Sequence, residues 1–241
     1  MMQFSRMKLL KRMEALKLAN RINFVFTTIV LLLISLQIAF VVRVEIEQVA
    51  YVSAATIYAY ASKYVDNLAL TFLPILLMVN VTKEFEYGVV QRTLVSGFSR
   101  ATYYLSKLLL VTSFAFCAVF LAMFFTILTS VFHEIPIAWN FGKLLMYFPA
   151  TFFMASFSLL LALLLPKSIH ALAAFISWIL LENIFHSIIQ DPDIGRFFPF
   201  QVCVGILKHN IFEWREFVAL QIFIALFWAG GYWRMHKMDL Q

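Results

Sequence analysis

The sequence has 241 residues, of which 63% are hydrophobic and 13% are charged, and 27 of them are phenylalanine. A soluble domain carries about 25% charged residues, so this composition excludes a soluble globular protein and indicates a chain surrounded mostly by lipid. The net charge of +6 does not indicate nucleic-acid binding, because the basic residues are sorted by side of the membrane. The two cysteines are isolated and predict neither a disulfide nor a metal site.

Residues 1–22 predict a basic amphipathic helix that lies on an anionic membrane surface. Lys and Arg alternate there with Leu9, Met13 and Leu16, which share one helical face. No small-residue cleavage site follows an apolar core, so a secretory signal is not expected.

Six apolar segments follow, each close to the ~20 residues that cross a bilayer. They are residues 24–42, 64–81, 105–125, 144–165, 169–189 and 217–233. Residues 166–168 are a tight turn, so the fourth and fifth spans form a helical hairpin. Residues 190–216 carry an apolar run at 202–207 that is too short to span. This segment predicts short re-entrant or interfacial helices before span six, and the alternative is a loop with a hydrophobic cover.

The distribution of Lys and Arg predicts the orientation of the chain. With the N-terminus in the cytoplasm, the inner side holds more cations than the outer side. The inner cations are Arg6, Lys8, Lys11, Arg12, Lys17, Arg21, Lys83, Arg92, Arg100, Lys107, Lys167, Arg234 and Lys237, and the outer ones are Arg43, Lys63, Lys143, Arg196, Lys208 and Arg215. Both termini are therefore predicted to be cytoplasmic, as is the connection between spans two and three.

That connection, residues 83–107, predicts a short helix with a defined start and stop. Glu84 and Glu86 are expected at its N-terminus, where negative charge is favoured. Gly97 is expected to stop it in a left-handed conformation, and Ser99 to cap the next helix. An apolar stripe is formed by Val89, Val90, Thr93, Leu94 and Phe98, with Gln91, Arg92 and Ser96 off it. Such a helix would suit docking of a soluble partner, and the alternative is a capped loop that only joins two spans.

One acidic residue, Glu182, lies deep in a predicted span, with His186 on the same helical face. The pair could form a proton or cation relay, or Glu182 could bond a neighbouring helix and fix packing. No nucleotide-binding GxxxxGK[ST] loop, HExxH or GxSxG motif occurs, so neither a catalytic site nor a metal site is expected on this chain.

Two spans contain proline, and one has a face of small residues. Pro74 and Pro149 each remove a backbone donor and are expected to bend their helices. The small residues of the fourth span are Thr151, Ala155, Ser158 and Ala162. That face favours close helix packing over a substrate path.

The connection between spans two and three contains a sequence pattern made of Glu84-Phe85-Glu86-Tyr87-Gly88, Gln91-Arg92-Thr93-Leu94, Gly97-Phe98-Ser99-Arg100 and Lys107. This pattern resembles the signature of type-two ABC exporter permeases. In that family the pattern is E-x-E-x-G-T, a short helix, then S-R and a Lys at the head of span three. Here Val89 replaces the Thr, and Gly97 stands where a Pro is common.

The resemblance implies an all-α permease, residues 1–241 as one transmembrane domain, in a bacterial cytoplasmic membrane. Two such chains would pair above two separate cytoplasmic ATPase subunits, which would bind ATP and Mg²⁺; this chain would hold no cofactor. Residues 1–22 would be the connecting helix, and residues 84–100 would contain the coupling helix, residues 86–96, that docks on the ATPase. Glu84 and Glu86 would position it, and Arg92 and Arg100 would contact the ATPase or the connecting helix.

Two other classes of function remain open from the sequence. One is a membrane enzyme, or a protein that handles protons or cations, built on Glu182 and His186. The other is a membrane anchor that recruits a soluble protein without transport. The sequence does not identify a transported substrate.

Overall fold

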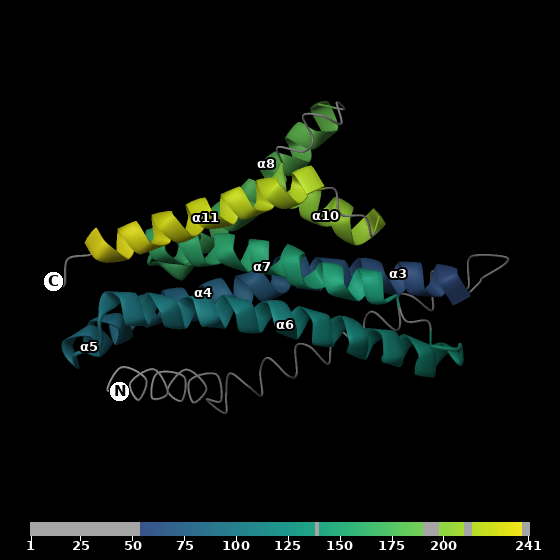
Figure 1. The fold of residues 1–241 in the computed structure, drawn as a ribbon, viewed down its shortest axis with the longest axis horizontal. Helices are drawn as coiled ribbons and strands as arrows, with labels where there is room; N and C mark the ends of the chain where they lie inside the picture. The colour runs from purple at the N-terminus through teal and green to yellow at the C-terminus, as the bar shows by residue number, and fades with distance from the viewer. Residues whose placement is uncertain (1–53, 138–139, 190–197, 210–213, 238–241) are drawn as a thin grey trace. The chain divides into compact units, whose positions relative to one another are not determined.

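The computed structural model describes residues 54–137, 140–189, 198–209 and 214–237 (Figure 1). The predicted amphipathic helix at 1–22, the predicted first span at 24–42 and both chain ends lie outside the described residues. The described residues form helices and turns, with no strand among them. The helices are α3 (Ala54–Asn67), the π-helix η1 (Leu68–Phe72), α4 (Leu73–Glu86), α5 (Val89–Val95), α6 (Arg100–His133), α7 (Phe141–Leu164), α8 (Ser168–Ile188), α10 (Pro199–His209) and α11 (Trp214–Lys237).

Among the described residues, five helices are long and apolar enough to cross a bilayer. They occupy Ile57–Glu86, Arg100–His133, Phe141–Leu164, Ser168–Ile188 and Trp214–Lys237. Each overlaps one of the predicted spans two to six, and most are longer than predicted because the helices continue into polar residues at their ends. The all-helical membrane class is therefore confirmed, whereas the first span and the orientation stay predictions.

The described residues form two compact units, one of residues 54–65 and 121–137 and the other of residues 66–120, 140–189, 198–209 and 214–237. In the first unit, the described residues come from α3 and from the C-terminal part of α6 with the turn after it. The Tyr58 hydroxyl donates to the carbonyl of Pro136 at 3.1 Å, which ties α3 to that turn. The second unit contains all the residues that matter for the candidate site.

The core of the second unit is built around α7, which packs against α4 on one side and α11 on another (Figure 1). Aromatic rings fill the α7–α11 contact, where Phe153 packs edge-on against Phe223 and Phe157 packs against Phe227. The Trp228 indole donates to the Ser156 hydroxyl at 3.2 Å. The small residues predicted to pack closely are fully buried on α7: Thr151, Ala155, Ser158 and Ala162.

The span before α5 contains a π-helical turn that the sequence did not predict. Residues Leu68–Phe72 form η1, and the amide of Leu73 donates to the carbonyl of Leu68, five residues back. Pro74 follows at the start of α4, where its missing amide hydrogen and its ring disfavour a regular α-turn. Pro149, in contrast, lies within α7, which runs unbroken from Phe141 to Leu164.

A short apolar helix, α10, precedes the last long helix, as the sequence predicts. Its buried residues include Cys203, Ile206 and Leu207, and it packs against α7 and α8. With 11 residues it is too short to span a bilayer. Residues 190–197 and 210–213 of the predicted outer segment lie outside the described part of the chain.

Candidate functional site

The connection between α4 and α6 contains the short helix α5, but the acidic pair does not open it. Glu84 and Glu86 belong to the last turn of α4, and the N-cap of α5 is Gly88 in a left-handed conformation with φ 65°. The expected helix start at Glu86 is therefore wrong, because the left-handed turn at Gly88 ends α4 before α5 begins.

The end of α5 has the predicted stop and the predicted cap. Gly97 has φ 92°, and its amide donates to Leu94 while the amide of Phe98 donates to Thr93. This pair of bonds is a Schellman motif, which satisfies the last carbonyls of a helix. The Ser99 hydroxyl then accepts the amide of Thr102 at 3.1 Å, which caps the start of α6.

Helix α5 has one buried and one exposed face. Of the predicted apolar stripe, Val90 and Thr93 are buried, and Val89, Leu94 and Phe98 are half-buried. The opposite face, together with the turn before α5, exposes a mixture of polar and apolar side chains: Tyr87, Gln91, Arg92, Val95 and Ser96. Val95 is 79% exposed, although it is aliphatic. The Arg92 guanidinium also donates a hydrogen bond to the carbonyl of Tyr87 at 3.1 Å, in the turn before α5.

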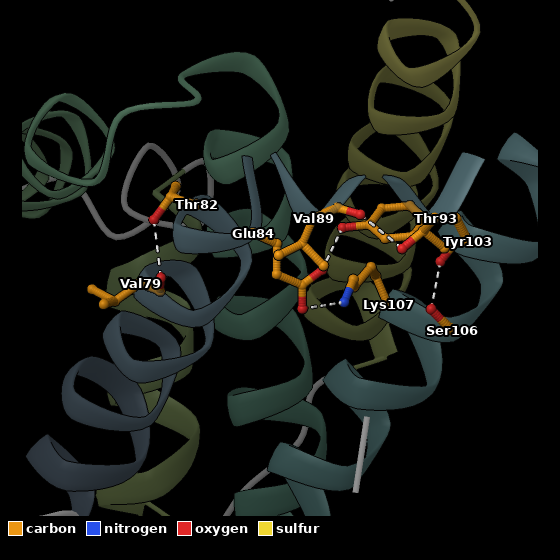
Figure 2. Close-up of polar contacts among 8 residues, drawn as sticks. All are labelled: Val79, Thr82, Glu84, Val89, Thr93, Tyr103, Ser106 and Lys107. Carbon is orange, nitrogen blue, oxygen red and sulfur yellow. Dashed lines mark hydrogen bonds and ion pairs between the residues drawn. The ribbon is translucent and has the colours of Figure 1, made fainter. Parts of the chain in front are cut away.

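Glu84 connects the end of α4 to the start of α6 through a buried ion pair. The Lys107 ammonium lies 2.9 Å from Glu84 Oε1, and the Tyr103 hydroxyl donates to Glu84 Oε2 at 2.7 Å. Figure 2 shows the Glu84 side chain between Tyr103 and Lys107. Lys107 is 0% exposed and Tyr103 is 1% exposed. An ion pair shielded from water in this way fixes the two helices with a defined geometry.

Glu86 connects the same end of α4 to α8. Its Oε1 accepts the amide of Ser168, the first residue of α8, at 2.7 Å. The first amides of a helix have no partner within the helix, so a carboxylate at this place caps α8. The hydroxyls of Thr82 and Ser168 share a further hydrogen bond of 2.8 Å.

Arg100 connects the start of α6 to the end of α11. Its Nη1 donates to the carbonyl of Met235 at 3.4 Å and also to the carbonyl of His236. The last carbonyls of a helix lack helical partners, and a guanidinium satisfies them well. The contacts of Arg100 are thus made within the chain, to the end of α11, which no local sequence pattern predicts as its partner.

The predicted coupling residues therefore gather at one end of the second unit. Glu84 and Lys107 bond each other, Glu86 holds α8, and Arg100 holds α11, while Gly88, Gly97 and Ser99 set the ends of the helices. Arg92 remains on the exposed face of α5. These bonds connect the ends of α4, α6, α8 and α11 next to α5, whose polar face is exposed.

The second predicted candidate, Glu182, caps a helix. It is buried, and its Oε2 accepts the amides of Phe200 at 2.8 Å and Gln201 at 3.3 Å, at the start of α10. The Trp178 indole donates to its other oxygen. His186 is exposed on the same helix, and no described hydrogen bond joins it to Glu182. This is the geometry that the packing interpretation predicts.

Sequence reasoning missed a third polar cluster, at the opposite end of α4 and α7. Lys143 lies 3.2 Å from Asp66 Oδ2, and the hydroxyl of the buried Tyr147 donates to Asp66 Oδ1. Lys143 and Tyr147 are one helical turn apart, and an acidic residue beside a span is a signal for such a cluster. The sequence did not show which helix would face Asp66.

Among the described residues, no three His, Cys, Asp or Glu side chains gather as a metal site would require. No family model matches this sequence, and a comparison with curated proteins finds no match. The function is therefore inferred from the residues of the chain and their contacts.

Proposed function

We propose that this chain is the permease subunit of an ATP-driven ABC exporter, which moves a substrate across the cytoplasmic membrane together with a separate ATPase. The observation that carries the proposal is α5: a short helix with an exposed face, whose flanking residues are bonded to the ends of α4, α6, α8 and α11. The motif of residues 84–107 agrees with this function because it resembles the signature of such permeases.

A force applied to α5 reaches the long helices only if its base does not yield. The buried Glu84–Lys107 pair, the cap from Glu86 to α8 and the Arg100 contacts to α11 supply three such connections. Each joins the residues next to α5 to a different long helix, so a displacement of α5 would move several of these helices together.

The exposed face of α5 has the composition of a protein interface. Aromatic residues and Arg are enriched at interfaces, and Tyr87, Arg92 and Val95 are all exposed here. In the proposal, a groove of the ATPase covers this face. Two ATPase subunits would bind ATP and Mg²⁺, and a second permease chain, identical or related, would complete the transporter.

The test is site-specific crosslinking in membranes of the source organism. A photoreactive benzoylphenylalanine at Val95 should form an adduct with a cytoplasmic protein that carries an ABC nucleotide-binding site. The matched control is Phe120 in α6, which is 68% exposed but lies in the middle of an apolar helix. The same reagent at Phe120 should give no adduct with that protein, because lipid should surround it.

The crosslinked protein should then copurify with the chain and hydrolyse ATP. Arg92→Glu with Val95→Asp should lower its copurification at least tenfold, which corresponds to about 1.4 kcal/mol of lost binding. Asn183→Ala, an exposed change on α8, should leave copurification unchanged. An adduct at Val95 with a protein that has no nucleotide site would refute the transporter and favour a membrane anchor. Equal adducts at Val95 and Phe120 would remove the evidence for docking at α5.

A further inference from the structure

Two buried hydroxyls of α7 have no hydrogen-bond partner among the described residues. They belong to Thr151 and Ser158, both fully buried. Other hydroxyls in this unit bond to a carbonyl of their own helix, as Ser156 does with Phe152 and Thr112 with Leu108. A buried hydroxyl without a partner costs about 1–3 kcal/mol, so such an exception requires an explanation.

Thr151 lies on the face of α7 that is directed at η1 and α4. It follows Tyr147 by four residues, which places the two side chains within about 40° of each other around the helix. Tyr147 bonds Asp66, which lies just before η1. The helices also run in the same direction, because the end of α4 bonds Ser168, just after α7. Thr151, one turn beyond Tyr147, therefore faces the residues that lie one turn beyond Asp66.

The side chains of η1 and α4 at that level offer no partner to the hydroxyl. The buried ones, Ala69, Leu70 and Leu73, are apolar, and the half-buried Thr71 makes no hydrogen bond to the Thr151 hydroxyl. A polar partner for Thr151 on this side must therefore come from the backbone or from a bound molecule.

The backbone of η1 has such a group. In an α-helix the carbonyl of Ala69 would accept the amide of residue 73, and in a π-helix that of residue 74. The amide of Leu73 donates to Leu68 instead, and Pro74 has no amide hydrogen. The Ala69 carbonyl, in a residue that is 1% exposed, thus has neither of its helical donors.

We infer that a buried water molecule binds at the π-turn and bridges the Thr151 hydroxyl and the Ala69 carbonyl. Water can donate to the carbonyl and either donate to or accept from the hydroxyl, so one molecule satisfies both groups. Buried waters occupy places of this kind, with two or more otherwise unpaired polar partners.

The test is a thermal-unfolding cycle on the full chain in lipid nanodiscs. Thr151→Val keeps the shape and removes the hydroxyl, and it should lower Tm by about 2–4 °C, the shift expected for one lost hydrogen bond in a chain of this size. Thr112→Val, whose hydroxyl bonds its own helix, is the matched control and should change Tm by less. Pro74→Ala restores an amide near the free carbonyl, so the Thr151→Val loss should fall to less than half in that background.

An unchanged or higher Tm for Thr151→Val overturns the inference, because removal of a dry unpaired hydroxyl is neutral or stabilising. A lower Tm with the full loss retained in the Pro74→Ala background overturns the bridge to Ala69. Should either variant fail to insert into the membrane, a density map of the unaltered chain with a bound antibody fragment tests whether the water is present. Density for water between Thr151 Oγ1 and the Ala69 carbonyl supports the inference, and its absence at a resolution that shows other waters overturns it.

Discussion

Lys107 is the residue on which the base of α5 most depends. Its side chain is fully buried although it lies on the apolar helix α6, and Glu84 supplies the negative charge beside its ammonium. A buried ion pair adds little net stability over an apolar pair, but loss of one partner leaves an uncompensated charge out of water. The cost of single and double replacement should therefore differ sharply.

We expect Glu84→Gln to destabilise the chain by about 3–5 kcal/mol, and Lys107→Met to cost less than that, because Met leaves no buried cation. The double variant, Glu84→Gln with Lys107→Met, should recover much of the loss. Unfolding of the purified chain, titrated with sodium dodecyl sulfate in mixed micelles, measures all three. Losses that simply add would mean that the two side chains do not form the pair described here.

At the scale of elements, Glu182 should hold the start of α10 in place. Its carboxylate accepts two amides of the first turn of α10, and Cys203 lies fully buried in the next turn. Burial raises the pKa of the Cys203 thiol, and the nearby charge of Glu182 raises it further. The thiolate is the reactive form, so the native thiol should be almost inert at neutral pH.

In a Cys117→Ala background, Glu182→Ala should therefore increase the maleimide labelling rate of Cys203 at least tenfold, because α10 loses its cap and opens more often. Asn183→Ala, which removes the exposed hydrogen bonds of Asn183 to Gln201 and to the carbonyl of Ile179, is the matched control and should label at the native rate. If Glu182→Ala also labels at the native rate, the carboxylate does not stabilise α10. That result would favour the alternative role of Glu182 in a proton or cation relay.

The elements differ in how far the sequence predicts them. Gly97 and Ser99 act on the backbone within a few residues, so local pattern predicts where α5 stops and α6 starts. The partners of Glu86 and Arg100 lie 82 and 136 residues away, and no local rule selects them. The π-turn was also missed, because proline in a span predicts a bend but not which carbonyls lose their donors.

At the scale of the whole molecule, the sorting of basic residues predicts that α5 faces the cytoplasm. The proposed function requires this, since ATP-hydrolysing partners are cytoplasmic. Two exposed positions test this orientation: Val95, shortly before α6 begins, and Ile137, shortly after α6 ends. They should lie on opposite sides of the membrane, because α6 is long enough to span it.

Single-cysteine variants, with Cys117 and Cys203 replaced by Ala, provide the measurement. A membrane-impermeant maleimide should label Val95→Cys only in inverted vesicles and Ile137→Cys only in right-side-out vesicles. Phe120→Cys, exposed but within the apolar part of α6, should resist labelling in both, and serves as the control that labelling requires contact with water. The reverse pattern would place α5 outside the cell, where no ATPase could reach it, and the proposed coupling would then be physically impossible whatever the quality of its contacts.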